Sequence, residues 1–182
     1  MTRLHAFMLA ASAALAAFAL AACGGRTACA DARTDSLTAA LKAADDSVAV
    51  NSPYALDMIN EGMATAADSL DYYDWYLRLM RYSVQRDVPD TASLRWRQAS
   101  RFLSECRRTP RVDGMTAFLL NAKGSYYYKL HFEPGKAVNA YSKAYTLLFG
   151  SDSEYRLPDV CANLGDAYVA ANDMPRAAWW YR

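Results

Sequence analysis

The chain has 182 residues, of which 53% are hydrophobic and 21% charged, and its formal net charge is +1. The length suits one domain, and the near-zero charge argues against a protein that binds nucleic acid, which would need a basic surface. Because the sequence has only two histidines and no phosphate-binding glycine loop, metal-ligand cluster or nucleophile elbow, we expect neither an enzyme nor a cofactor or metal site.

Residues 1–22 have the pattern of a targeting segment. A positive residue near the start precedes an almost wholly apolar stretch at residues 6–22, and two small residues, Ala21 and Ala22, precede Cys23. This order resembles a bacterial lipoprotein signal peptide, in which cleavage leaves the cysteine free to be acylated. We therefore expect lipidation at Cys23 and anchoring to a membrane of the cell envelope, on its periplasmic or outer-membrane side. The alternative is an uncleaved anchor helix, although the apolar stretch is at the short end of the roughly 17 to 25 residues that spanning requires.

Residues 23–34 are small, polar and unpatterned, which predicts a flexible tether between the lipid and the folded domain. Cys29 lies in this tether, whereas Cys106 and Cys161 lie on predicted helices without the paired spacing of a zinc site. In an exported protein Cys106 and Cys161 could form a disulfide. We favour unpaired buried thiols, because cysteine on a helix commonly behaves as a small hydrophobic residue.

From residue 35 onward the sequence predicts helices in succession, with no alternating strand pattern bounded by hairpin turns. Several predicted helices begin where a capping oxygen stands beside a proline, as at Ser52-Pro53, Thr109-Pro110 and Asp173-Met174-Pro175. The fold class is therefore predicted to be all-α. The predicted helices are residues 35–49, 53–66, 68–86, 90–107, 110–130, 134–149, 158–171 and 174 to the end.

Every second predicted helix carries the same pattern of small and large residues. A small residue is followed four positions later by a large one and, in three of the helices, by another small one three positions after that. The sets are Ala55, Ile59 and Gly62; Ala92, Trp96 and Ala99; Ala137, Tyr141 and Ala144; and Ala177 with Tyr181. The spacing between sets is longer than the roughly 34 residues of a regular tetratricopeptide repeat. The pattern predicts divergent repeats with extended loops.

The last predicted hairpin carries the clearest repeat signature. A leucine, a glycine and an aromatic residue share one helical face before a short break, and an alanine and an aromatic residue follow it one turn apart. These residues are Leu164, Gly165, Tyr168, Ala177 and Tyr181. Gly124 and Tyr127 repeat part of the signature in the preceding hairpin. Small residues let two antiparallel helices approach closely, and aromatic residues fill the remaining space.

With these motifs, the stretch from about Ser52 to Arg182 resembles the exported tetratricopeptide sensor regions of Bacteroidetes-type regulators. The resemblance implies antiparallel helix hairpins stacked as a short α-solenoid over residues 35–182, with the last repeat incomplete. The competing interpretation is an ordinary helical bundle.

The leading hypothesis for function is a membrane-tethered tetratricopeptide module that binds a peptide or protein partner on its concave face. One alternative is the N-terminal sensing region of a larger signal-transducing regulator with a histidine kinase or DNA-binding output domain. A second alternative is a glycan-binding lipoprotein with tetratricopeptide-like helices.

In tetratricopeptide proteins the first helix of each hairpin lines the concave side, and the resemblance implies where a ligand would bind. Relative to the close-packing residues Gly124 and Gly165, we expect the positions one after, three before and six before each glycine to face the groove. The expected residues are Phe118, Asn121, Ser125, Asp159, Ala162 and Asp166, with Tyr128 and Lys129 one turn further on. Aromatic, amide and acidic groups suit an extended peptide with a basic side chain, whereas the competing interpretation is a solvated face.

Aromatic residues are clustered in three places, around Tyr72 to Tyr76, Tyr126 to Tyr128 and Trp179 to Tyr181. Runs this dense exceed what one face of a helix can bury, so some rings are expected to face a groove or a neighbouring repeat. Packing in the core and between repeats is the favoured interpretation, and a platform for carbohydrate or peptide is the alternative.

Overall fold

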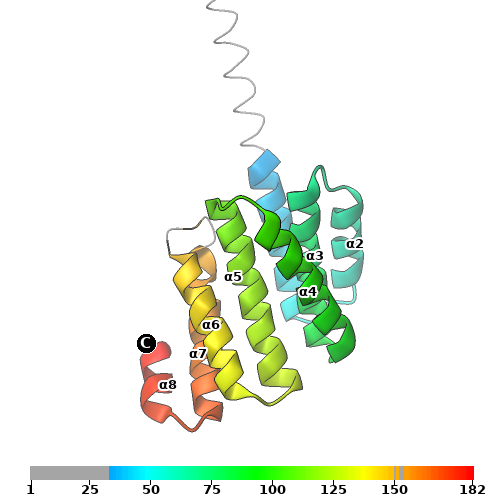
Figure 1. Ribbon diagram of the computed structural model, residues 1–182. Coiled ribbons are helices and arrows are strands. Elements are labelled where there is room, and N and C mark those ends of the chain that lie inside the picture. The colour runs from blue at the N-terminus through cyan, green and yellow to red at the C-terminus, as the bar shows by residue number, and fades with distance from the viewer. Residues whose placement is uncertain (1–32, 150, 152–153) are drawn as a thin grey trace, which may run out of the picture. The chain divides into compact units, whose positions relative to one another are not determined.

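The structure is a computed structural model that describes residues 33–149, 151 and 154–182 (Figure 1). The chain divides into two units, residues 1–43 and 44–182, and the features discussed below lie in the second. Cys23, the expected signal peptide at residues 1–22 and most of the expected tether lie outside the described residues.

The predicted all-α fold class is confirmed, and the described residues contain no strand. Residues 33–49 form the first described helix. The elements that follow are α2 (Ala55–Ala64), α3 (Ser69–Gln85), α4 (Pro89–Glu105), α5 (Pro110–Ser125), the π-helical turn η1 (Tyr126–Leu130), α6 (Pro134–Leu148), the 3-10 turn η2 (Glu154–Arg156), α7 (Leu157–Ala170) and α8 (Met174–Trp180).

The helix starts follow the capping chemistry of the sequence. Asp68, Thr109 and Asp173 each accept a backbone N–H of the first turn, at 2.9, 3.2 and 3.1 Å, and so begin α3, α5 and α8. The predicted start at Ser52-Pro53 is two residues too early. The Ser52 hydroxyl accepts an N–H within a turn before the helix, and α2 begins at Ala55.

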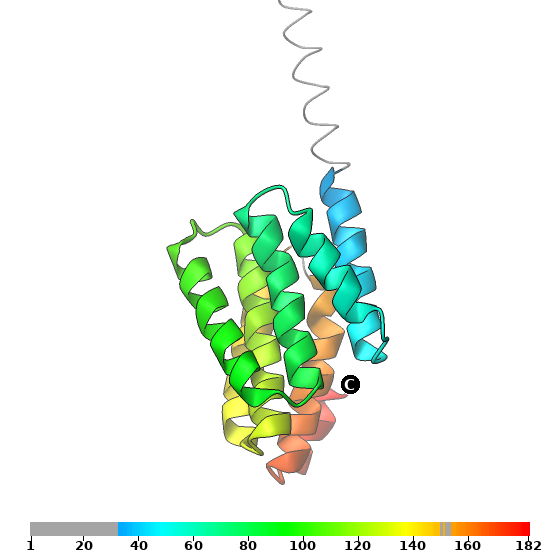
Figure 2. The same ribbon diagram turned by 90° about the vertical axis from the view of Figure 1, so that its right-hand side faces the viewer.

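Consecutive helices pack against one another from α2 to α8, and α3 also packs on α5. Because each helix reverses the direction of the one before it, α3, α5 and α7 run parallel to one another, and α4, α6 and α8 run the opposite way (Figures 1 and 2). This arrangement aligns the corresponding ends of α3, α5 and α7.

Most of the recurring small and large residues of the sequence lie in the core, although Tyr181 is 53% exposed. Tyr141 is 1% exposed, and the alanines on either side of it in the pattern are fully buried. A Cβ atom on Gly124 would overlap the Tyr141 ring, and one on Gly165 would overlap the ring of Tyr181. Two successive hairpins thus use the same close contact, in which a glycine on the first helix receives a tyrosine from the second.

The two described cysteines, Cys106 and Cys161, are free and half-buried. The possible disulfide between them is therefore absent, in line with the favoured interpretation. Burial raises the pKa of the Cys161 thiol above its ordinary value, which keeps this thiol protonated and weakly reactive at neutral pH.

Candidate functional site

Mostly polar and charged residues recur at steps of three, four or seven positions along α3, α5 with its continuation η1, and α7. Because a helix has 3.6 residues per turn, each such series lies on one side of its helix. The members are Asp71, Asp74, Arg78, Arg81 and Gln85; Arg111, Phe118, Asn121, Ser125 and Tyr128; and Asn163, Asp166 and Ala170. Bonds between the helices bring the three series together, and we call the result the three-helix face.

Seven charged residues from α3, the starts of α5 and α7 and the first described helix form a connected group, here called the Arg–Asp network. Its members are Asp45, Asp71, Asp74, Arg78, Arg81, Arg111 and Arg156. Arg78 is 2% exposed and donates to Asp74 at 2.7 Å and to Asp45 at 3.0 Å. Arg156 donates to the same Asp45 carboxylate at 2.8 Å. The charges of this group are therefore paired with one another.

The electrostatics of the network favour its charged form. Burial raises the pKa of the Asp45 carboxyl, but the nearby guanidinium groups of Arg78, Arg156 and Arg81 outweigh burial and hold that pKa below its ordinary value. The guanidinium groups of Arg78 and Arg156 also lie 4.4 and 4.5 Å from the centre of the Phe118 ring. Cation–π contact and ion pairing together close this end of the face.

The middle of the three-helix face holds a pair of asparagines. Asn163 donates from its amide nitrogen to the side-chain oxygen of Asn121 at 3.0 Å, which links α7 to α5. Each carboxamide has both donors and an acceptor, so this bond leaves the amide nitrogen of Asn121 and the oxygen of Asn163 without a partner among the residues that the structure describes. Both residues are half-buried. An adjacent donor and acceptor of this kind match the two polar groups of a peptide bond.

The opposite end of the face is hollow. A cavity of about 650 Å³, here called the Tyr128 pocket, lies where α3, η1 and α7 end. Its lining residues are Gln85, Asp87, Tyr128, Lys129, Phe132, Pro134 and Ala170. Lys129 donates to Gln85 at 2.9 Å, and Phe132 is 83% exposed. The pocket therefore offers an aromatic ring, an ammonium group and a carboxylate to solvent.

The backbone around the Tyr128 pocket is irregular. The π-helical turn η1 carries Tyr128 and Lys129, and such turns are frequent at functional sites. Asp87 and Phe132 have φ angles of 56° and 54°, in the left-handed region that residues other than glycine seldom adopt. Each such residue costs of the order of 1 kcal/mol or more, so the conformation of both lining loops is fixed by their surroundings.

The structure separates the predicted ligand-binding residues into groups. Tyr128 and Lys129 line the Tyr128 pocket, and Asn121 belongs to the asparagine pair. Phe118 differs from the expectation of an exposed groove residue, because it is 5% exposed and covered by two guanidinium groups. Asp159 and Ala162 are exposed on α7, where they bond to no other described residue.

Ser125 and Asp166, also predicted to meet a ligand, each contact the tyrosine of their own hairpin. The Ser125 and Tyr141 hydroxyls share a hydrogen bond of 3.1 Å, and the Tyr181 hydroxyl donates to Asp166 at 2.6 Å. The bond to Asp166 raises the pKa of Tyr181 to about 12. The two positions therefore hold hairpins together, and Asp166 has one carboxylate oxygen left for a ligand.

The sequence patterns did not point to α3, nor to Arg78, Gln85 and most of the Arg–Asp network. The helix has Met80 where the repeat signature requires glycine, so the signature does not identify it. The spacing of its charged residues by three and four positions carried the signal. Asn163 was also missed, because the expected register placed Ala162 in the groove instead.

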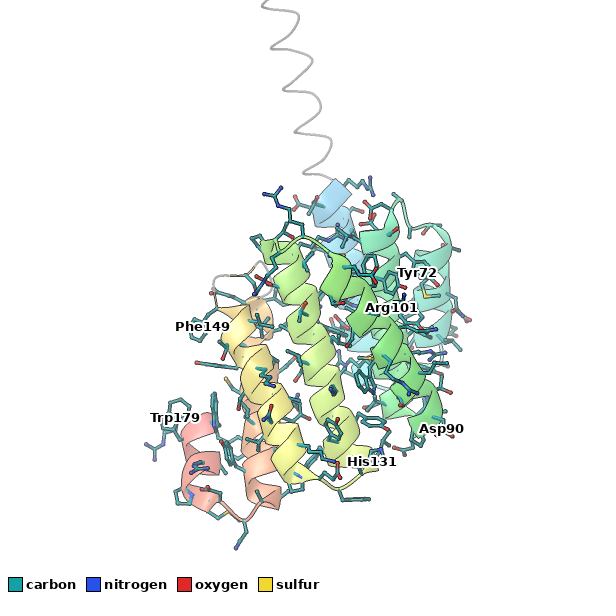
Figure 3. The ribbon with its side chains drawn as sticks, viewed as in Figure 1. Tyr72, Asp90, Arg101, His131, Phe149 and Trp179 are labelled. Atoms are coloured by element: carbon teal, nitrogen blue, oxygen red, sulfur yellow. The ribbon has the colours of Figure 1, made fainter. Side chains whose placement is uncertain are left out.

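Some of the clustered aromatic residues are buried in the core and others are exposed, as the length of the runs suggested. Trp75 is buried, whereas Phe149 and Trp179 are 60% and 62% exposed and project from the ends of α6 and α8 (Figure 3). His131 is exposed beside the Tyr126 ring, with 4.6 Å between ring centres.

Within residues 33–149, 151 and 154–182, no three or more His, Cys, Asp or Glu side chains converge as a metal site. No helix in the same part of the chain is both long and apolar enough to cross a membrane. Neither a protein-family model nor a curated protein nor a solved structure matches this chain.

Proposed function

We propose that this protein is a membrane-tethered interaction module of the tetratricopeptide type, which binds an extended segment of a peptide or protein along the three-helix face. The repeated contact between a glycine and a tyrosine, at Gly124 with Tyr141 and at Gly165 with Tyr181, supports the repeat architecture. The lipoprotein pattern before Cys23 supports the tether. A peptide partner in the cell envelope is consistent with both.

The observation that carries the proposal is the unsatisfied half of the asparagine pair beside the Tyr128 pocket. The amide nitrogen of Asn121 would donate to a ligand carbonyl, and the oxygen of Asn163 would accept a ligand N–H. A peptide held by its backbone there would extend toward Tyr128 and Lys129, which follow Asn121 on the same helix and its continuation. The pocket would then receive a large side chain.

The Arg–Asp network limits where the ligand binds. Its guanidinium groups and carboxylates are already paired, and Phe118 lies beneath two of them. Breaking such a pair leaves a buried charge without a partner, which costs several kcal/mol. The ligand is therefore expected to occupy the half of the face from the asparagine pair to the pocket, where the carboxylate of Asp166 suits a basic side chain.

A glycan is the second candidate ligand, and the lining of the Tyr128 pocket favours it specifically. The exposed Phe132 ring offers an apolar surface for a sugar ring, while Gln85 and Asp87 offer groups that bond to hydroxyls. This candidate needs the pocket alone, whereas the peptide needs the asparagine pair as well.

Selection of a displayed library of random decapeptides on the full chain tests the proposal. Against a selected peptide, Asn121→Ala and Asn163→Ala should each weaken binding by about 1 to 3 kcal/mol, because each removes a bond to the backbone and leaves a polar group unpaired. Asn139→Ala, an exposed asparagine on α6, is the matched control and should bind as the wild type does.

Two outcomes would count against the peptide. One is that no peptide binds saturably, and the other is that both variants keep wild-type affinity with unchanged circular dichroism. If a glycan array gives a ligand whose binding depends on Phe132 and not on Asn121, the glycan takes the place of the peptide.

A further inference from the structure

A second, smaller cavity of about 270 Å³ lies between α5 and α6, here called the lysine pocket. Its lining residues are Leu120, Lys123, Tyr127, Gly135, Lys136, Asn139, Ala140 and Lys143. The lining positions on α5 and η1, Leu120, Lys123 and Tyr127, fall on a different side of that helix from Asn121 and Tyr128. The lysine pocket is therefore separate from the face proposed to bind a peptide.

Three lysines line this pocket, and their ammonium groups are poorly neutralised. Lys136 pairs with Glu133 at 2.8 Å at the exposed edge. Within the described residues, Lys123 and Lys143 form no ion pair. The Lys123 ammonium lies instead 4.1 Å from the centre of the Trp96 ring. An aromatic ring attracts a cation but does not cancel its charge.

The charges of Lys123 and Lys143 act on each other. Burial, and after it the positive charge of Lys143, holds the pKa of Lys123 below its ordinary value. Lys143 is itself exposed, so it is free to turn toward the cavity. The folded chain thus keeps like charges close together around a hollow, at a cost in free energy that a bound anion would remove.

We infer that the lysine pocket binds a phosphate group. A phosphate carries up to two negative charges and several acceptor oxygens, so it can receive hydrogen bonds from Lys123, Lys136 and Lys143 at once. The ammonium groups of Lys123 and Lys136 both lie near Tyr127, at 5.8 and 5.6 Å from its ring centre.

The size and the open side of the pocket fit this ligand. About 270 Å³ accommodates a phosphate group with a small substituent, and it is less than half the volume of the Tyr128 pocket. No atom lies within 4 Å of a Cβ placed on Gly135, so the entrance at the start of α6 is clear. The phosphate could belong to a soluble ester or to the headgroup of an anionic lipid, because both present the same group.

Calorimetric titration of the full chain with inorganic pyrophosphate at low salt tests the inference, together with cosedimentation with phosphatidylglycerol and phosphatidylcholine vesicles. Lys123→Gln and Lys143→Gln should each weaken binding about tenfold or more, since each removes one charge-assisted hydrogen bond. Gly135→Glu should abolish binding while keeping the helical circular dichroism, because it adds a carboxylate in open space. Arg97→Gln removes an equal charge from an exposed site on α4 and should change little.

The two arms of the experiment identify the source of the phosphate. Lysine-dependent binding of pyrophosphate indicates a soluble ligand. Lysine-dependent binding only to phosphatidylglycerol vesicles, over the phosphatidylcholine background set by any lipid anchor, indicates a headgroup. The inference is overturned if the chain binds neither probe, or if Arg97→Gln weakens binding as much as Lys123→Gln does, which would reveal a general charge effect.

Discussion

Both ends of the three-helix face combine charged and aromatic side chains, yet they behave in opposite ways. In the Arg–Asp network every charged group meets an oppositely charged partner, and Arg78 is almost wholly buried. In the Tyr128 pocket the ammonium group of Lys129 meets only the neutral amide of Gln85, and Phe132 extends into solvent. Fixed partners make the first end a structural element, and free groups leave the second end available to a ligand.

The largest effect on stability is expected from removing an arginine of the Arg–Asp network. Arg78→Ala removes the guanidinium group shared by Asp45 and Asp74 and leaves two buried carboxylates with fewer partners. The free energy of unfolding should fall by about 3 to 5 kcal/mol. Urea denaturation followed by circular dichroism measures this change.

Lys129→Ala is the matched variant in the Tyr128 pocket. It removes only the hydrogen bond to Gln85, which is exposed to solvent. It should change the free energy of unfolding by less than about 0.5 kcal/mol. If the two variants destabilise the protein equally, the contrast between a closed and an open end does not hold.

Two glycines allow a similar comparison, because one contacts a buried tyrosine and the other an exposed one. Gly124→Ala forces a methyl group against Tyr141, which is 1% exposed and cannot move aside. Gly165→Ala meets Tyr181, which is 53% exposed and can swing outward. We expect Gly124→Ala to cost about 1 to 3 kcal/mol through overpacking and Gly165→Ala to cost less. Thermal unfolding of both variants measures the difference, and a larger loss for Gly165→Ala would contradict the explanation.

The last prediction concerns the loss of stability at low pH. The folded protein holds the pKa of Asp45 below its ordinary value, so this carboxylate contributes stability above the pKa of the unfolded chain, about 3.9. That contribution is lost as the pH falls from about 4 through the folded pKa. In urea titrations at pH 7 and below pH 4, Asp45→Asn should lose less stability on acidification than the wild type. If both proteins lose the same stability on acidification, the arginine neighbours do not lower the pKa of Asp45.

Local chemistry explains why the helices could be predicted from the sequence. Proline in the first turn and a capping oxygen fix the starts of α5 and α8 within the chain segment itself. The π-helical turn at Tyr126–Leu130 was not foreseen, and these residues were predicted as the end of one continuous helix. Its conformation depends on packing against α3, α4 and α6, which no local pattern encodes.

The candidate site was less predictable, because its parts meet only in the folded chain. Tyr128 and Lys129 were expected near a ligand from the register of one repeat, and they line a cavity. Phe118 obeyed the same register and is nevertheless covered, since Arg78 and Arg156 reach it from other helices. The spacing of residues predicts only the side of a helix on which each one lies. Whether a residue is buried depends on its contacts with other helices.

The ion pair between Asp45 and Arg156 also bears on how the domain folds. These residues are 111 positions apart in the chain, and the pair joins the first described helix to the turn before α7. An array of hairpins that touched only their neighbours could fold from any point and open from its ends. A bond of such long sequence separation raises the contact order, which slows folding. It also ties the first described helix to the start of α7, so we expect these helices to unfold together.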